Sequence, residues 1–146
     1  MAGNRSAPSK KMFTPAQANA ALPLVKVILQ DICTLARSLR DRQERLARLS
    51  GGLRGAMSDA HREELQQVQT ELERDDERMR EYIQELAELG VELKDPFSGL
   101  IDFPAWMDGH EVYLCWRLGE PEVGFWHELE AGFAGRQRLM IPARSR

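Results

Sequence analysis

Three side chains in the C-terminal third of the chain have types that bind metal ions or transfer protons. Asp102 and Glu120 offer carboxylates, and His127 offers an imidazole. Two carboxylates with an imidazole suit a divalent transition metal, and the same set can work as an acid–base pair. No local H-x-x-x-H or E-x-x-H spacing joins them, so the fold must bring them together. The sequence therefore predicts a metal or acid–base site where Asp102, Glu120 and His127 converge.

The same residues also have structural interpretations. Asp102 interrupts an apolar run, and a carboxylate in such a run is either buried and paired or turned toward a cleft. The structural alternative for Asp102 is an ion pair with Arg117 or Arg136. By strand alternation, His127 shares the apolar face of residues 123–129. The structural alternative for His127 is a core histidine with satisfied hydrogen bonds.

A glycine-spaced loop offers a second kind of site. Gly132 and Gly135 present bare backbone amides, and Arg136 follows with a guanidinium. Together they could hold a small anionic ligand or the anionic group of a cofactor. The alternative is a tight turn in which Arg136 pairs with an acid. The two interpretations differ in whether the amides and the guanidinium are free.

Charge, cysteine use and motifs narrow the function classes. The chain has 146 residues with a formal net charge of −3, which disfavours nucleic-acid binding by the whole molecule. The arginine-rich stretch 37–48 is followed by an acidic stretch, which indicates paired helix faces. Cys33 and Cys115 lie far apart, as in proteins of the reducing cytoplasm. We find no P-loop, dinucleotide fingerprint or nucleophile elbow, and no apolar run of the roughly 20 residues that span a membrane.

The first part of the chain predicts a long antiparallel helical hairpin over residues 13–90. A capping box opens it at Thr14, and Pro23 is expected to kink the first helix. Both helices carry apolar residues spaced by three and four, and each seam has one charged gap, Arg42 and Asp75. An antiparallel turn within 51–58 brings these two residues level, so we expect them to face each other. The apolar seam positions are Val25, Ile28, Ile32, Leu35, Leu39, Leu46, Leu49 and Leu53, then Leu65, Val68, Leu72, Met79, Tyr82, Leu86 and Leu89.

The period changes after Val91, which predicts a small β unit over residues 91–146 packed on the open end of the hairpin. Asp108-Gly109 is a two-residue hairpin signal, and strands are expected at 110–118 and 123–129. With a short run ending at Pro104, this gives a three-stranded antiparallel meander. The predicted fold class is α+β, mainly α. Residues 1–12 are expected to be a disordered tail and 13–146 a single domain.

Several motifs resemble a known family. The resemblance covers roughly residues 13 to 141 and identifies the chain with the prokaryotic family catalogued as domain of unknown function 2203. It implies a prokaryotic, cytoplasmic protein and supplies no activity. Arg138 departs from a proline expected in that family. The motifs are Phe13, Ala18-Asn19, Leu22-Pro23, Gly99-Leu100-Ile101-Asp102-Phe103-Pro104, Val112-Tyr113-Leu114-Cys115-Trp116, Leu118-Gly119-Glu120, Trp126-His127 and Gly132-Phe133-Ala134-Gly135-Arg136.

Two functions from different classes follow. The first is a non-enzymatic interaction or scaffold protein that self-associates through the hairpin, because two hairpins side by side make a four-helix bundle. The alternative is a protein that binds a divalent metal ion or a small anion in the C-terminal unit, with an enzymatic role left open. The two functions are compatible within one chain.

Overall fold

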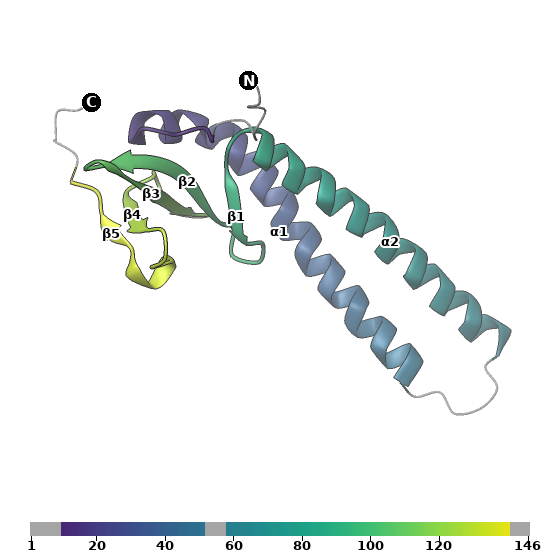
Figure 1. The fold of residues 1–146 in the computed structure, drawn as a ribbon. Helices are drawn as coiled ribbons and strands as arrows, with labels where there is room; N and C mark the ends of the chain where they lie inside the picture. The colour runs from purple at the N-terminus through teal and green to yellow at the C-terminus, as the bar shows by residue number, and fades with distance from the viewer. Residues whose placement is uncertain (1–9, 52–57, 141–146) are drawn as a thin grey trace, which may run out of the picture.

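The computed structural model describes residues 10–51 and 58–140, which form two long helices followed by a five-stranded antiparallel sheet (Figure 1). The predicted α+β, mainly helical class is confirmed. The expected connection between the helices and most of the expected N-terminal tail lie outside the described residues. The elements are α1 (Pro15–Gly51), α2 (Asp59–Glu88), β1 (Glu92–Asp95), β2 (Leu100–Met107), β3 (His110–Arg117), β4 (Phe125–Glu128), the 3₁₀ turn η1 (Phe133–Gly135) and β5 (Gln137–Arg138).

Helix α1 begins and bends where the sequence predicts. The Thr14 amide donates to Gln17 Oε1 at 3.0 Å, and the Gln17 amide donates to Thr14 Oγ1 at 3.1 Å, which is a capping box. Pro23 lies inside the helix and has no amide hydrogen for the carbonyl of Asn19. Figure 1 shows the first turns of α1 at an angle to the remainder. The bend lets these turns lie along the sheet while the rest of α1 runs beside α2.

Helix α2 also has the predicted ends. Ser58 accepts a hydrogen bond from the His61 amide at 3.1 Å and caps the first turn. At the other end, Gly90 has a φ of 89°, and the Val91 amide donates to the Leu86 carbonyl at 3.1 Å. This is a Schellman motif, for which glycine is favoured because the left-handed conformation strains other residues. The chain thereby leaves α2 directly into β1.

The two charged seam residues meet as predicted. The Arg42 guanidinium bonds to the Asp75 carboxylate, and Arg42 Nε lies 3.4 Å from Glu71 Oε1. Asp75 is 7% exposed, so Arg42 supplies a partner that water cannot replace at this buried position. A charged pair inside an apolar seam fixes the register of two helices at some cost in stability.

This pair gives a stability prediction. Arg42→Leu alone should lower the free energy of unfolding by about 2 kcal/mol, because it leaves the buried Asp75 carboxylate without its main partner. Arg42→Leu/Asp75→Leu should recover most of that loss, because two leucines extend the apolar seam. Urea unfolding of the three proteins followed by circular dichroism measures both values. A double variant no more stable than the single one would contradict the prediction.

The sheet has five strands where three were predicted. The strand expected to end at Pro104 continues to Met107, and two further strands, β1 and β5, close its edges. Pro104 is tolerated because its carbonyl accepts from the Phe13 amide at 2.7 Å, on the side away from β3. The missing proline N–H would point to that same side, so no bond between β2 and β3 is lost.

One face of the sheet and the base of the hairpin share the main core. Alternate residues of β2 and β3 pack against α1 and the end of α2, as the apolar open end of the hairpin predicts. By length and composition alone, α1 could cross a membrane, contrary to the expectation that no segment qualifies, yet its buried face belongs to this core. The fully buried large side chains include Val25, Leu29, Ile32, Leu86, Ile101, Phe103, Leu114 and Trp116.

Candidate metal-binding site

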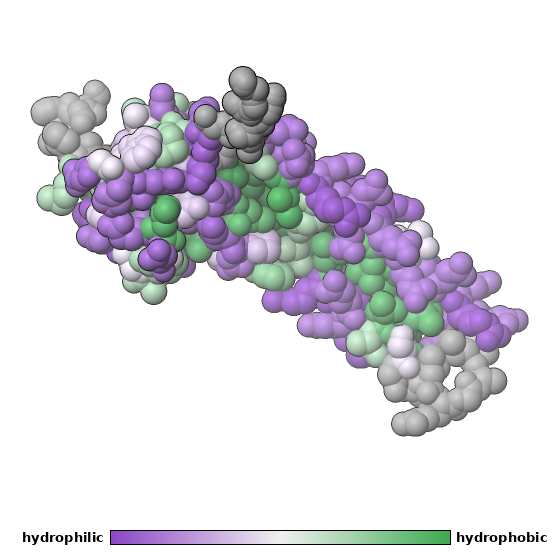
Figure 2. All heavy atoms as spheres, viewed as in Figure 1, coloured by the Kyte–Doolittle hydropathy of each residue, from purple (hydrophilic) through white to green (hydrophobic). Residues whose placement is uncertain are grey.

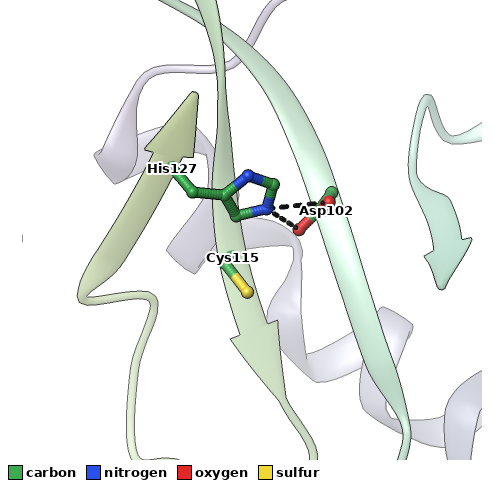
Figure 3. Close-up of side chains that lie close together, drawn as sticks. All are labelled: Asp102, Cys115 and His127. Atoms are coloured by element: carbon green, nitrogen blue, oxygen red, sulfur yellow. Dashed lines mark hydrogen bonds and ion pairs between the residues drawn. The ribbon is translucent and has the colours of Figure 1, made fainter. Parts of the chain in front are cut away.

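The sheet face opposite the helices carries a buried polar cluster. Asp102 of β2 and His127 of β4 point toward each other, and Cys115 of β3, the strand between them, lies beside the pair (Figure 3). Asp102 and Cys115 stand directly opposite each other, and His127 pairs with Tyr113, two residues before Cys115. The three cluster residues are 2%, 0% and 2% exposed.

The sequence predicted only in part which face of the sheet each side chain near His127 occupies. Phe125 and His127 share a face, as expected, but this face points away from the helices. The β4 residue that packs against the helical core is Trp126, and Leu129 is exposed after the strand ends. His127 is therefore buried among polar and aromatic groups and lies apart from the main apolar core.

The hydrogen-bond partners of His127 indicate which ring nitrogen carries a proton. Nδ1 lies 2.8 Å from the Glu128 carbonyl oxygen, which can only accept, so Nδ1 carries a proton. Nε2 lies 3.1 Å from both carboxylate oxygens of Asp102. A hydrogen bond here requires one further proton, shared between the imidazole and the carboxylate. We assign this tautomer from the partners of the ring.

Burial dominates the acid–base properties of the other two groups. It raises the pKa of the Asp102 carboxyl, although His127, through its charge and hydrogen bond, pulls the pKa back down. Burial also raises the pKa of the Cys115 thiol to about 11, opposed by a hydrogen bond from Arg136. At neutral pH, Cys115 is therefore a thiol.

Nucleophilic catalysis does not fit this geometry. A catalytic cysteine is exposed enough to reach a substrate and has a lowered pKa, whereas Cys115 is fully buried with a raised pKa. In a Cys–His–Asp triad, one imidazole nitrogen faces the thiol and the other faces the carboxylate. Here the nitrogen that does not face Asp102 is bound to the Glu128 carbonyl.

The geometry of the three cluster residues suits metal binding better than catalysis by the cysteine. The three potential ligand atoms all lie within 4.8 Å of one another. Two ligand atoms each about 2 Å from one zinc ion, at an angle of roughly 100°, are separated by the 3.1 Å found between His127 Nε2 and the Asp102 oxygens. A metal-bound histidine usually donates its other N–H to a carbonyl or carboxylate, as Nδ1 does to Glu128.

Glu120, predicted as the third ligand, lies elsewhere. Its carboxylate forms a two-pronged ion pair with Arg136, and Oε1 also accepts from the Arg117 amide at 3.0 Å. The expected ion pair between Asp102 and an arginine is wrong, because Asp102 pairs with His127 instead. Arg136 still touches the cluster, since its Nη1 lies 3.7 Å from Cys115 Sγ.

The glycine loop is arranged as a turn. Gly132 has a φ of 68°, the Gly135 amide donates to the Gly132 carbonyl at 3.1 Å, and the Arg136 amide donates to the Phe133 carbonyl at 3.1 Å. These two amides are thus occupied within the turn, and Arg136 pairs with an acid. A Cβ on Gly135 would lie 2.7 Å from Ala131 Cβ, so close packing explains the glycine.

A sequence-family model described as an uncharacterized conserved protein (DUF2203) matches residues 11–139. The chain belongs to the DUF2203 family. No curated protein and no solved structure matches it. The DUF2203 match contains both helices, the sheet and all three cluster residues, and it assigns no activity to them.

Sequence reasoning missed Cys115 in this DUF2203 chain, although a signal for it exists. A two-residue turn at Asp108-Gly109 pairs Met107 with His110, and counting outward places Cys115 opposite Asp102. Asp102 and Cys115 are opposite each other even if the preceding strand ends at Pro104, because the register is set by the turn.

The Glu120–Arg136 pair gives a prediction with a defined pH dependence. Burial alone would raise the pKa of Glu120, but bonds to Arg136 and the Arg117 amide lower it overall from the ordinary value of 4.5. Ionised Glu120 therefore stabilises the fold above that value, and the contribution is lost as the pH falls through the lowered pKa.

Glu120→Gln should reduce the free energy of unfolding at pH 7 by about 1 kcal/mol. The difference from wild type should shrink toward zero below the ordinary glutamate pKa. Urea unfolding across this pH range measures it, and Glu122→Gln, an exposed neighbour, is the matched control. A deficit that is independent of pH would contradict the ion-pair explanation.

Proposed function

We propose that this DUF2203 protein binds a divalent transition metal through Asp102, Cys115 and His127. The observation that carries the proposal is the convergence of these three side chains, buried and on three adjacent strands, with their ligand atoms within 4.8 Å of one another. A carboxylate, an imidazole and a thiol that loses its proton on metal binding come together here on three neighbouring strands.

The donor types favour zinc. Thiolate and imidazole select zinc and chemically similar ions over magnesium and calcium, which prefer oxygen ligands throughout. Three protein ligands leave a fourth tetrahedral position for water or an external ligand, as in catalytic zinc sites. Arg136 supports the thiolate, because its N–H group donates toward Cys115 Sγ.

The fold does not need the metal to satisfy its buried groups. Within the described ranges, no buried side-chain nitrogen or oxygen is left without a hydrogen-bond partner. A metal ion would replace the shared Asp102–His127 proton and the Cys115 thiol proton. We therefore expect the metal-free protein to be folded, so metal binding can be measured without unfolding. Both cysteines are free and buried, which suits the reducing cytoplasm we propose as its location.

Metal content and metal titration test the proposal. Protein purified without chelator should contain about one zinc ion per chain by elemental analysis. After chelator treatment, calorimetric titration with Zn²⁺ should show one site, and Co²⁺ should give a thiolate-to-cobalt absorption band. Protein with neither stoichiometric metal nor a saturable titration would overturn the proposal.

A further inference from the structure

The far half of the hairpin, residues 39–51 and 58–76, extends beyond the sheet as a two-helix arm (Figure 1). Its apolar seam is incompletely covered, because Leu46, Leu49 and Leu65 stay partly exposed. Figure 2 shows hydrophobic side chains reaching the surface between hydrophilic rows on the two helices. A two-helix arm is too thin to bury such a seam on both sides.

The two sides of the seam differ in charge. Arg45, Glu64 and Glu71 each directly precede a seam residue, and all three take part in ion pairs that bridge the helices on that side. Residues that directly follow a seam residue lie on the opposite side of an antiparallel pair. There we define an amide strip of five exposed, uncharged residues: Gln43, Ala47, Ser50, Gln66 and Gln69.

The amide strip lies on the same two helices as the charged side, and the two differ only in which flank of the seam they occupy. Depletion of charge is the compositional mark of an interface core, while interface rims stay charged. Toward the sheet, the residues that follow seam residues on this side are charged and opposite in sign: Arg40 on α1, Glu73 and Asp76 on α2. A twofold arrangement would place Arg40 of one arm near Glu73 and Asp76 of the other.

We infer that a second copy of this chain docks along the amide strip, arm beside arm. The four helices then form an antiparallel bundle in which α1 of each copy packs against α2 of the other. This covers the exposed edge of the seam and brings Arg40 of each copy near Glu73 and Asp76 of the other. A second copy carries both charges because it has the same sequence. The inference is independent of the metal site.

Light scattering coupled to size exclusion, with sedimentation equilibrium, tests the inference on the full chain. Wild type should be a dimer at micromolar concentration. Gln43→Arg/Gln69→Arg places four like charges in the dimer interface and should weaken dimerisation by at least about 100-fold. The matched control is Gln30→Arg/Gln84→Arg, the same change at exposed positions on the same two helices, facing away from the seam.

The control should remain dimeric, and circular dichroism should show equal helix content in all three proteins. A monomeric wild type at several hundred micromolar would overturn the inference and would leave the amide strip to a different partner. A dimer that tolerates Gln43→Arg/Gln69→Arg as well as it tolerates the control would overturn it too, because the contact would then lie elsewhere.

Discussion

Cys115→Ser should reduce zinc affinity by at least about 100-fold. Serine is nearly isosteric with cysteine, but its hydroxyl does not ionise near neutral pH and is a poor ligand for zinc. Calorimetric titration of chelator-treated protein measures the loss. The cobalt derivative should lose its thiolate absorption band at the same time, because that band requires a bound sulfur.

Cys33→Ser provides a matched control, since Cys33 is the other buried cysteine and lies outside the cluster. It should keep the zinc affinity and the cobalt band of wild type. Equal loss in both variants would point to a general effect of the substitution on folding. Unchanged affinity in Cys115→Ser would remove the thiol from the site and overturn the proposed donor set.

His127→Leu should destabilise the metal-free protein by about 3 to 5 kcal/mol, the usual cost of leaving one partner of a buried charged pair alone. Asp102 would remain 2% exposed in wild-type geometry without its hydrogen-bond partner. Asp102→Leu/His127→Leu should recover most of the loss, because no buried charge then remains. Urea unfolding in the presence of chelator measures all three proteins, and His110→Leu, at an exposed histidine, should change little.

The same variant should respond to pH in a defined direction. Burial raises the pKa of Asp102, and His127 opposes that rise, so removing His127 raises the pKa further. A group with a raised pKa in the folded state favours folding at low pH, and this contribution is lost as the pH rises through that pKa. The deficit of His127→Leu should therefore be smaller at pH 5 than at pH 8. The opposite trend would contradict an unpaired buried carboxylate.

Features set by local sequence were predictable. The capping box at Thr14, the cap at Ser58 and the glycine after α2 each depend on a few neighbouring residues. The Arg42–Asp75 pair was predictable across 33 residues because two regular helices joined by a turn have one register. Helical periodicity thus carries long-range information once the turn is located.

The cluster was harder to predict because it depends on which strands become neighbours. Glu120 carries the same carboxylate group as Asp102, and sequence alone does not separate an acid that pairs with an arginine from an acid that pairs with a histidine. Glu120 also satisfies a local need, since its carboxylate accepts from the amide of Arg117 in its own turn. Such local satisfaction competes with long-range ligation.

The proline within β2 has a consequence for solubility. β2 continues past the end of β1, so its outer side offers backbone groups to which a strand from another molecule could add. At Pro104, that side has no N–H, and its carbonyl already accepts from Phe13. A foreign strand would find neither a donor nor a free acceptor at this position, and Pro104 itself is buried, so this edge of β2 is a poor template for aggregation.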